Sequence, residues 1–252
     1  MGIVISIANH KGGVGKTTTV ASLGACLSSL GYKTLMIDLD AQANLTGSFM
    51  KVDSERSVYD ALRERDGLPI FEVKDRLHLV PSSLDMAGIE LELSSSMSRE
   101  FILKDLISDH EGKYDYILLD CPPSLGLIAV NAFVASTDII VPLTAEALPF
   151  KGLTMIENVI GMVRKRLNPS LHLSGIVFCR WEGRKLNRMV EETLRGTYGE
   201  VVMRTRIRTN ISLAEAPLSR EDILSYNPSS NGAADYMALT REIIGLFNDQ
   251  KR

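Results

Sequence analysis

Short apolar runs alternate with longer stretches of helical periodicity along most of the chain. Because the runs are apolar on both faces, each fits a strand covered by helices on both sides. The pattern predicts an α/β fold, a three-layer α/β/α arrangement around a mostly parallel twisted sheet with right-handed crossovers. The predicted strands are Ile3–Ala8, Thr34–Asp38, Leu77–Pro81, Tyr116–Asp120, Ile139–Pro142 and Leu173–Phe178.

The amino-acid composition and net charge indicate which class of protein this is. Of 252 residues, 45% are hydrophobic, and 28 Lys and Arg stand against 31 Asp and Glu for a net charge of −3. These values are ordinary for a globular chain and exclude disordered and collagen-like proteins. No Pro, Gly or Ser-rich linker divides the sequence, so residues 1–252 are predicted to form a single domain.

Cysteine usage and the N-terminus bear on the compartment. The three cysteines, Cys26, Cys121 and Cys179, are widely spaced and form no C-x-x-C unit, which favours buried free thiols in a reducing compartment. The first eight residues lack the charged region of a signal peptide. No run of about 18 apolar residues occurs. We therefore expect a cytoplasmic protein with no membrane association.

A glycine-rich motif, Gly12-Gly-Val-Gly-Lys-Thr-Thr18, follows the first predicted strand and opens a predicted helix. Glycines let backbone N–H groups approach phosphate oxygens, and the helix N-terminus adds partial positive charge. Lys16 would reach the β- and γ-phosphates, and the Thr17 hydroxyl would bind Mg²⁺. His10 stands where the general P-loop has its first glycine, so this is a variant P-loop. The residues predicted to bind nucleotide here are Gly12, Gly13, Val14, Gly15, Lys16, Thr17 and Thr18.

Acidic residues end two of the predicted strands. Asp38 and Asp40 close the second run, and Asp120 closes the run Tyr116–Asp120 in the apolar-then-Asp form of a Walker B strand. One carboxylate at such strand ends can hold Mg²⁺ while another orients an attacking water. We predict a metal site at Thr17, Asp38 and Asp120.

The motifs Lys11–Thr18, Asp38-Leu-Asp-Ala-Gln-Ala-Asn44 and Asp120-Cys-Pro-Pro-Ser124 occur in an order that resembles the ParA/Soj family. Members are deviant Walker A (SIMIBI-type) ATPases, relatives of MinD, that partition chromosomes and plasmids. The resemblance implies ATP and Mg²⁺ as cofactors, an ATP-dependent homodimer, a ParB-like centromere-binding partner that stimulates weak ATPase activity, and non-specific DNA binding at the nucleoid. It extends over Leu84–Glu92, Pro123–Leu127, Leu213–Pro217 and Tyr226–Ala233.

The same resemblance implies roles for individual residues. Lys11 is similar to the lysine that crosses the dimer interface to the partner's nucleotide, as an arginine finger does elsewhere. Asp40 is similar to the residue required for hydrolysis. Arg208 and Asn210 are expected beside the nucleotide, with Asn210 near the adenine. The γ-phosphate is expected to order the loops 40–47 and 120–127.

Two departures from the family pattern stand out. Ala41 replaces the proline of Asp-Pro-Gln, which is expected to loosen that loop. Ile207-Arg-Thr-Asn210 stands where members commonly read Ile-Pro-Arg-Asn, so Thr209 occupies the position of an arginine linked to DNA binding. Asn231 replaces a later basic residue. The family's DNA contacts at these two positions therefore cannot be assigned to this chain.

Residues 180–208 hold eight basic and four acidic residues, a net charge of +4 that leaves −7 for the rest of the chain. Such a patch can attract a phosphate backbone without reading sequence. A solvated helix face with salt bridges is the alternative. The predicted DNA contacts are Arg184, Lys185, Arg188, Arg206 and Arg208.

The sequence is also compatible with other functions. A MinD-like ATPase that cycles on a membrane would use a basic amphipathic C-terminal helix, whereas the apolar side of Tyr236–Phe247 is predicted to pack on the sheet. A ParA-like ATPase that positions a protein cluster or microcompartment would use the same chemistry. An iron–sulfur relative is disfavoured because no cysteine pair could ligate a cluster. The P-loop begins at residue 11, so we expect neither an N-terminal operator-binding domain nor autoregulation.

Overall fold

The computed structural model describes residues 2–51, 55–110, 112–145 and 149–250. They form an eight-stranded sheet with the order β3-β4-β2-β5-β1-β6-β7-β8. Neighbouring strands are parallel except β3 and β4. The strands are β1 (Ile3–Ile7), β2 (Thr34–Asp38), β3 (Phe71–Lys74), β4 (Leu77–Val80), β5 (Tyr116–Asp120), β6 (Asp138–Thr144), β7 (His172–Trp181) and β8 (Val202–Arg208).

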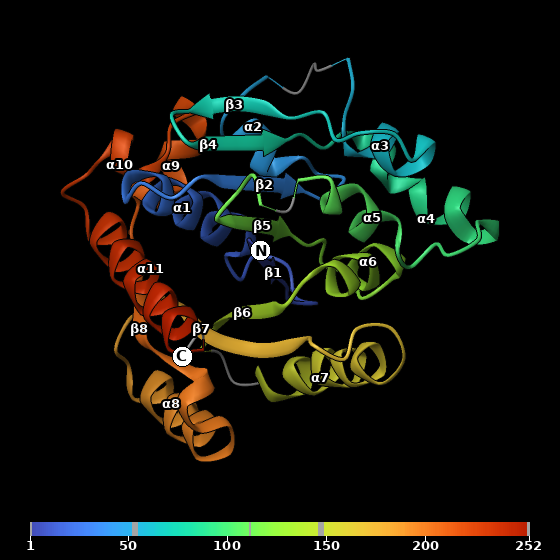
Figure 1. Cartoon of the computed structure of the whole chain (residues 1–252). Helices are drawn as coiled ribbons and strands as arrows, with labels where there is room; N and C mark the ends of the chain where they lie inside the picture. The colour runs from blue at the N-terminus through green and yellow to red at the C-terminus, as the bar shows by residue number, and fades with distance from the viewer. Residues whose placement is uncertain (1, 52–54, 111, 146–148, 251–252) are drawn as a thin grey trace.

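Helices cover both faces of the sheet and complete three layers (Figure 1). On one face lie α1 (Lys16–Ser29) and α11 (Asn231–Gln250). On the other lie α3 (Val58–Glu64), α5 (Ile102–Ser108), α6 (Leu127–Ala135), α7 (Pro149–Arg166) and α8 (Lys185–Tyr198). The short helices are α2 (Asn44–Gly47), α4 (Ile89–Glu92), α9 (Ser212–Glu215) and α10 (Ile223–Tyr226), with 3₁₀ turns η1 (Leu84–Ala87), η2 (Leu93–Ser95), η3 (Gly199–Val201) and η4 (Ala216–Ser219).

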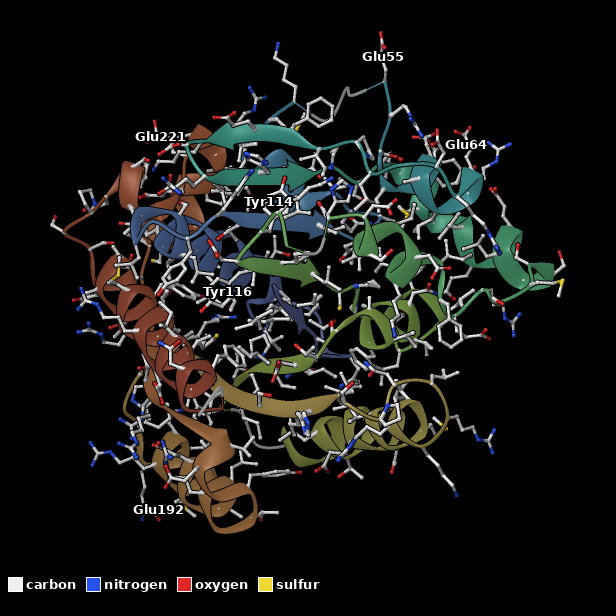
Figure 2. All side chains as sticks on the ribbon, in the orientation of Figure 1. Glu55, Glu64, Tyr114, Tyr116, Glu192 and Glu221 are labelled. Carbon is white, nitrogen blue, oxygen red and sulfur yellow. The ribbon has the colours of Figure 1, made fainter. Side chains whose placement is uncertain are left out.

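The core consists of two apolar layers, one on each face of the sheet. Tyr114 and Tyr116 lie inside, whereas Glu55, Glu64, Glu192 and Glu221 lie on the outside (Figure 2). Central strands β2 and β5 are buried along their whole length, which explains their continuous apolar sequences. All three cysteines are buried free thiols, as predicted.

All six predicted strands are present, and the fold class is confirmed. The buried residues Tyr236, Leu239, Ile243 and Phe247 confirm that the C-terminal helix packs on the sheet. Two strands were missed, β3 and β8, and both lie at the edges. Edge strands have one neighbour, so charged residues alternate through Phe71–Lys74 and Val202–Arg208 without hydrophobic runs.

Within the described ranges, no helix combines the length and the apolar character needed to cross a lipid bilayer.

Candidate functional site

The glycine-rich loop joins β1 to α1 at the carboxyl end of the central strand, as the sequence predicted. Gly13 and Gly15 adopt φ values of 72° and 97°, a left-handed conformation that favours glycine. In the described part of the chain, no side chain caps the N-terminus of α1, and its first turn contains no acidic residue. Open space lies beside the α-carbons of Gly12 and Gly13. The loop and helix terminus therefore form a cradle of backbone donors suited to phosphate.

Lys16 lies inside this cradle, although lysine is rarely buried. The residue is only 7% exposed, and its Nζ donates a hydrogen bond to the Lys11 carbonyl oxygen at 3.4 Å. Burial lowers the pKa of the ammonium group, and the nearby Asp120 carboxylate acts most strongly in the opposite direction. The ammonium is thus held where it can offset phosphate charge.

Lys11 is exposed at the mouth of the loop. Its backbone N–H donates to Asn9 Oδ1 at 3.0 Å, while Asn9 Nδ2 donates to the Pro142 carbonyl oxygen on β6 at 2.7 Å. Asn9 therefore anchors the start of the loop to the neighbouring strand. Asn9 is not among the residues predicted from the sequence, and its signal there is a polar side chain directly after an apolar strand.

Asp38 and Asp120 face each other across the register of β2 and β5. Both residues are fully buried. Asp38 Oδ2 accepts hydrogen bonds from Thr46 N at 2.8 Å and Thr46 Oγ1 at 2.7 Å, and Asp38 Oδ1 accepts one from Asp40 N at 3.2 Å. In the described structure, neither carboxylate oxygen of Asp120 has a hydrogen-bond partner.

The two carboxylates therefore differ in their hydrogen bonding: both oxygens of Asp38 accept hydrogen bonds, whereas neither oxygen of Asp120 does so within the described structure. Burial, and then the charge of Asp38, raises the pKa of Asp120 well above its ordinary value, against the Thr17 hydroxyl and Lys16. Burial also raises the pKa of Asp38, against its hydrogen bonds from Thr46. A buried carboxylate without a partner is costly unless a cation neutralises it. The donor set of Asp120 and the Thr17 hydroxyl consists of hard oxygens and fits Mg²⁺.

Asp40 lies just beyond the end of β2 in a tight turn. Its Oδ1 accepts from Gln42 N at 3.0 Å, and its carbonyl oxygen accepts from Ala43 N at 2.9 Å and from Ser82 Oγ at 2.8 Å. These bonds anchor the loop even though Ala41 replaces the family proline. Thr46 and Ser82 thus position the acidic residues, and neither is part of a motif that marks it in the sequence.

A small pocket opens beside Thr17 and Thr18 of α1, with apolar groups from the C-terminal part of the chain on its opposite wall. Asn210 lies in the loop that leads to this wall, and its Oδ1 accepts from Ser212 N at 3.0 Å. The C-terminal part of the lining consists of Leu213, Ala216, Pro217 and Ile223 together with the acidic residues Glu221 and Asp222. Its position beside the P-loop helix suits the base or sugar of a nucleotide.

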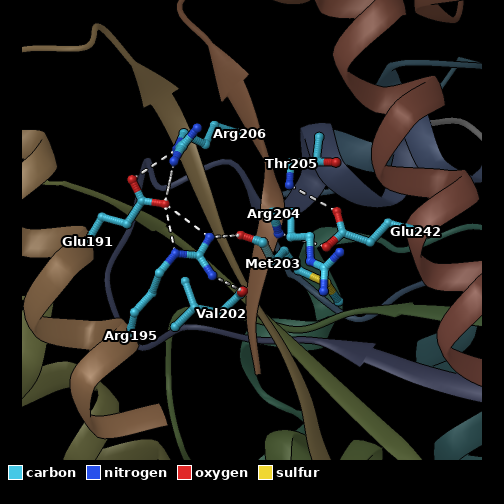
Figure 3. Close-up of polar contacts among 8 residues, drawn as sticks. All are labelled: Glu191, Arg195, Val202, Met203, Arg204, Thr205, Arg206 and Glu242. Carbon is cyan, nitrogen blue, oxygen red and sulfur yellow. Dashed lines mark hydrogen bonds and ion pairs between the residues drawn. The ribbon is translucent and has the colours of Figure 1, made fainter. Parts of the chain in front are cut away.

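The five predicted DNA contacts fall into two groups. Arg206 makes a bidentate ion pair with Glu191, which also binds Arg195 (Figure 3). The Arg206 guanidinium lies 5.0 Å from the centre of the Trp181 ring. Arg208 pairs with Asp235 of α11 at 2.6 Å. Arg184, Lys185 and Arg188 instead lie exposed at the start of α8, with Arg184 paired to the surface residue Glu182.

Comparisons with known proteins agree with this geometry. Residues 2–173 match the AAA domain family. The chain is 38% identical to the sporulation initiation inhibitor protein Soj of Bacillus subtilis, over 96% of the chain and 98% of the relative. It is 35% identical to the chromosome partitioning protein ParA of Caulobacter vibrioides, over 98% of the chain and 96% of the relative.

Solved structures show the same likeness. Cobyrinic acid a,c-diamide synthase of Mycobacterium smegmatis with bound ADP and magnesium is 30% identical with a TM-score of 0.86, over 98% of this chain and 96% of that one. The septum site-determining protein MinD of Pyrococcus horikoshii, complexed with Mg-ADP, is 27% identical with a TM-score of 0.79, over 96% of each chain. With the variant P-loop and near full-length matches to Soj and ParA, the chain belongs to the ParA/Soj family of partitioning ATPases.

Proposed function

We propose that this chain is an ATP-hydrolysing switch for DNA segregation, built as one ATPase domain over residues 1–252. It binds Mg·ATP, forms a homodimer in that state, binds DNA non-specifically in the cytoplasm at the nucleoid, and is stimulated by a ParB-like partner. The observation that carries the nucleotide chemistry is the buried Asp120 carboxylate, unpartnered among the described residues, beside Lys16 and the P-loop. The family resemblance supports the dimer, the DNA and the partner.

Each residue has a defined task in this proposal. The backbone N–H groups of Gly12–Thr18 and the Lys16 ammonium bind the phosphates. Thr17 and Asp120 would hold Mg²⁺, which would supply positive charge to offset the negative charge of the phosphates. Asp38 holds the Asp40 loop through Thr46. Asp40 orients a water for attack on the γ-phosphorus. The bond from that phosphorus to the β–γ bridging oxygen breaks, ADP leaves with this oxygen, and the water becomes part of the phosphate with release of a proton.

Removal of Mg²⁺ gives the first prediction. Addition of EDTA is expected to weaken ATP binding about tenfold or more in the wild-type protein, because Lys16 alone would then have to offset the phosphates and two buried acidic groups. Asp120→Asn should lose most of this Mg²⁺ dependence. Titration with a fluorescent ATP analogue, with and without EDTA, measures both effects. An equal Mg²⁺ dependence in the two proteins would count against Asp120 as a ligand.

We place the DNA contact at Arg184, Lys185 and Arg188, because Arg206 and Arg208 already have carboxylate partners. Binding of Arg206 to DNA would break its ion pair and leave the buried Glu191 short of a donor. The exposed side chains at the start of α8 can bind a phosphate without breaking a buried ion pair, so the free-energy cost is small. Arg206 and Arg208, predicted to contact DNA, are therefore reassigned to holding β8 against α8 and α11.

This reassignment gives the second prediction. Replacing Arg184, Lys185 and Arg188 together with alanine should weaken binding to random-sequence DNA and lower the slope of log affinity against log salt by about 0.9 per lost phosphate contact. Arg206→Ala should leave that slope unchanged and reduce the free energy of unfolding by about 1–3 kcal/mol. Fluorescence anisotropy over a salt series and chemical denaturation measure the two quantities. If Arg206→Ala lowered the salt slope and the triple variant left it unchanged, the proposed DNA contact at Arg184, Lys185 and Arg188 would be refuted.

The proposed function as a whole is tested by ATP-dependent binding to random-sequence DNA and to anionic liposomes. Wild-type protein with ATP should bind DNA and should not bind liposomes. Lys11→Ala, as the dimer-deficient control, should bind neither. Binding to liposomes without binding to DNA would overturn the segregation proposal in favour of a membrane-associated positioning ATPase.

A further inference from the structure

One segment, residues 82–92, contacts the loops on both sides of the candidate site, and we call it the bridge segment. Near its start, Ser82 Oγ donates to the Asp40 carbonyl oxygen at 2.8 Å. Ser82 N donates to Thr46 Oγ1 at 2.9 Å, and the same hydroxyl donates to Asp38 Oδ2. The first end of the bridge segment is therefore bonded to the loop that carries Asp40.

The other end reaches the loop that follows Asp120. Glu90, in α4, accepts a hydrogen bond at Oε1 from Ile128 N at 3.2 Å, in the first turn of α6. The residue before α6 is Gly126, which has no side chain to cap the helix. Glu90 supplies this cap from another segment, and its negative charge suits the N–H groups and dipole of a helix N-terminus.

Gly126 allows the carboxylate to come close. A Cβ placed on Gly126 would lie 2.6 Å from Glu90 Oε2, and Oε1 would be closer still. Ile89, fully buried next to Glu90, fixes the bridge segment in the core. The chain from Asp120 thus enters α6 at a place defined by contact between Glu90 and Gly126.

We propose that Glu90 is a positioning residue for ATP hydrolysis. It touches neither the P-loop nor the acidic residues of the site. Through the bridge segment it sets the loop that follows Asp120 relative to the loop that carries Asp40, at the edge of the sheet where β5 and β2 end. The proposal rests on hydrolysis at the site as assigned above and is independent of DNA or partner binding.

The test compares Glu90→Ala with Glu92→Ala. Glu92 lies in the same short helix and contacts only the outer residues Tyr59 and Arg63 among the interactions described. Glu90→Ala should lower kcat about tenfold to a hundredfold, because a displacement of about 1 Å can cost that much. KM and the affinity for a fluorescent ATP analogue should change little, and Glu92→Ala should match the wild type. Glu90→Gln, which keeps an acceptor, should recover much of kcat.

A double-mutant cycle with Gly126→Ala removes ambiguity from misfolding. The added methyl should clash with Glu90 and lower kcat, whereas in the Glu90→Ala background it should have little further effect. Additive effects, or a Glu90→Ala protein with a lower Tm and an unchanged kcat, would overturn the positioning role. A wild-type protein that binds ATP and does not hydrolyse it would instead refute the proposed function, and this inference with it.

Discussion

Replacement of Asp40 by alanine is expected to slow ATP hydrolysis by about 10²–10⁴-fold while ATP binding is retained, because a positioned carboxylate acting on water supplies a rate factor of this size. Asp40 lies outside the P-loop cradle. The variant loses the bond from Gln42 N to the Asp40 carboxylate, but the Asp40 carbonyl oxygen still accepts from Ala43 N and from the Ser82 hydroxyl. The loop should therefore keep its shape in the variant.

Single-turnover hydrolysis and binding of a fluorescent ATP analogue measure the two parts of this prediction. The variant should also accumulate the ATP-bound dimer, seen by size-exclusion chromatography with ATP. Asp75→Ala is the matched control, since that carboxylate is 93% exposed. Hydrolysis at the wild-type rate in Asp40→Ala would remove Asp40 from the mechanism.

Replacement of Lys11 by alanine is expected to lower hydrolysis by about 10³–10⁵-fold, the range found when a cation supplied by another molecule is lost from phosphoryl transfer. Lys11 lies exposed at the mouth of the loop, and its backbone is held by Asn9 independently of its side chain. The cradle should therefore still bind ATP, whereas ATP-dependent dimerisation should be lost.

Mixing the two inactive variants tests whether Lys11 acts across the dimer. In a heterodimer of Lys11→Ala and Asp40→Ala, one of the two sites combines an intact Asp40 with Lys11 from the partner. Titrating one variant into the other should therefore restore part of the ATPase activity. If Lys11 acts within its own chain, both sites stay defective and the mixture gains nothing.

The sequence identified the parts of the site that are continuous along the chain. Positive φ angles at Gly13 and Gly15, the apolar runs of central strands, and the aspartates at strand ends all follow from local requirements. It did not show which of the two aspartates, Asp38 or Asp120, already accepts hydrogen bonds. In the structure, the Thr46 hydroxyl donates to Asp38, whereas Asp120 has no hydrogen-bond partner among the described residues.

The basic stretch shows the opposite case. Its charge and spacing are visible in the sequence, and they suggested that all five cations face a polyanion. Arg206 meets Glu191 and Arg208 meets Asp235 only because edge strand β8 lies between α8 and α11. A net charge counts these arginines as free, whereas the fold pairs them with carboxylates.

By itself, then, the sequence determined the α/β class, the P-loop, the acidic strand ends and the family. Each of these is encoded in a few adjacent residues, whose backbone conformation or burial follows from their own chemistry. Only the tertiary structure decided which carboxylate remains available, which arginines are paired, and that Glu90 caps α6 across 38 residues. These outcomes depend on which side chains the sheet brings together, and no local pattern records that.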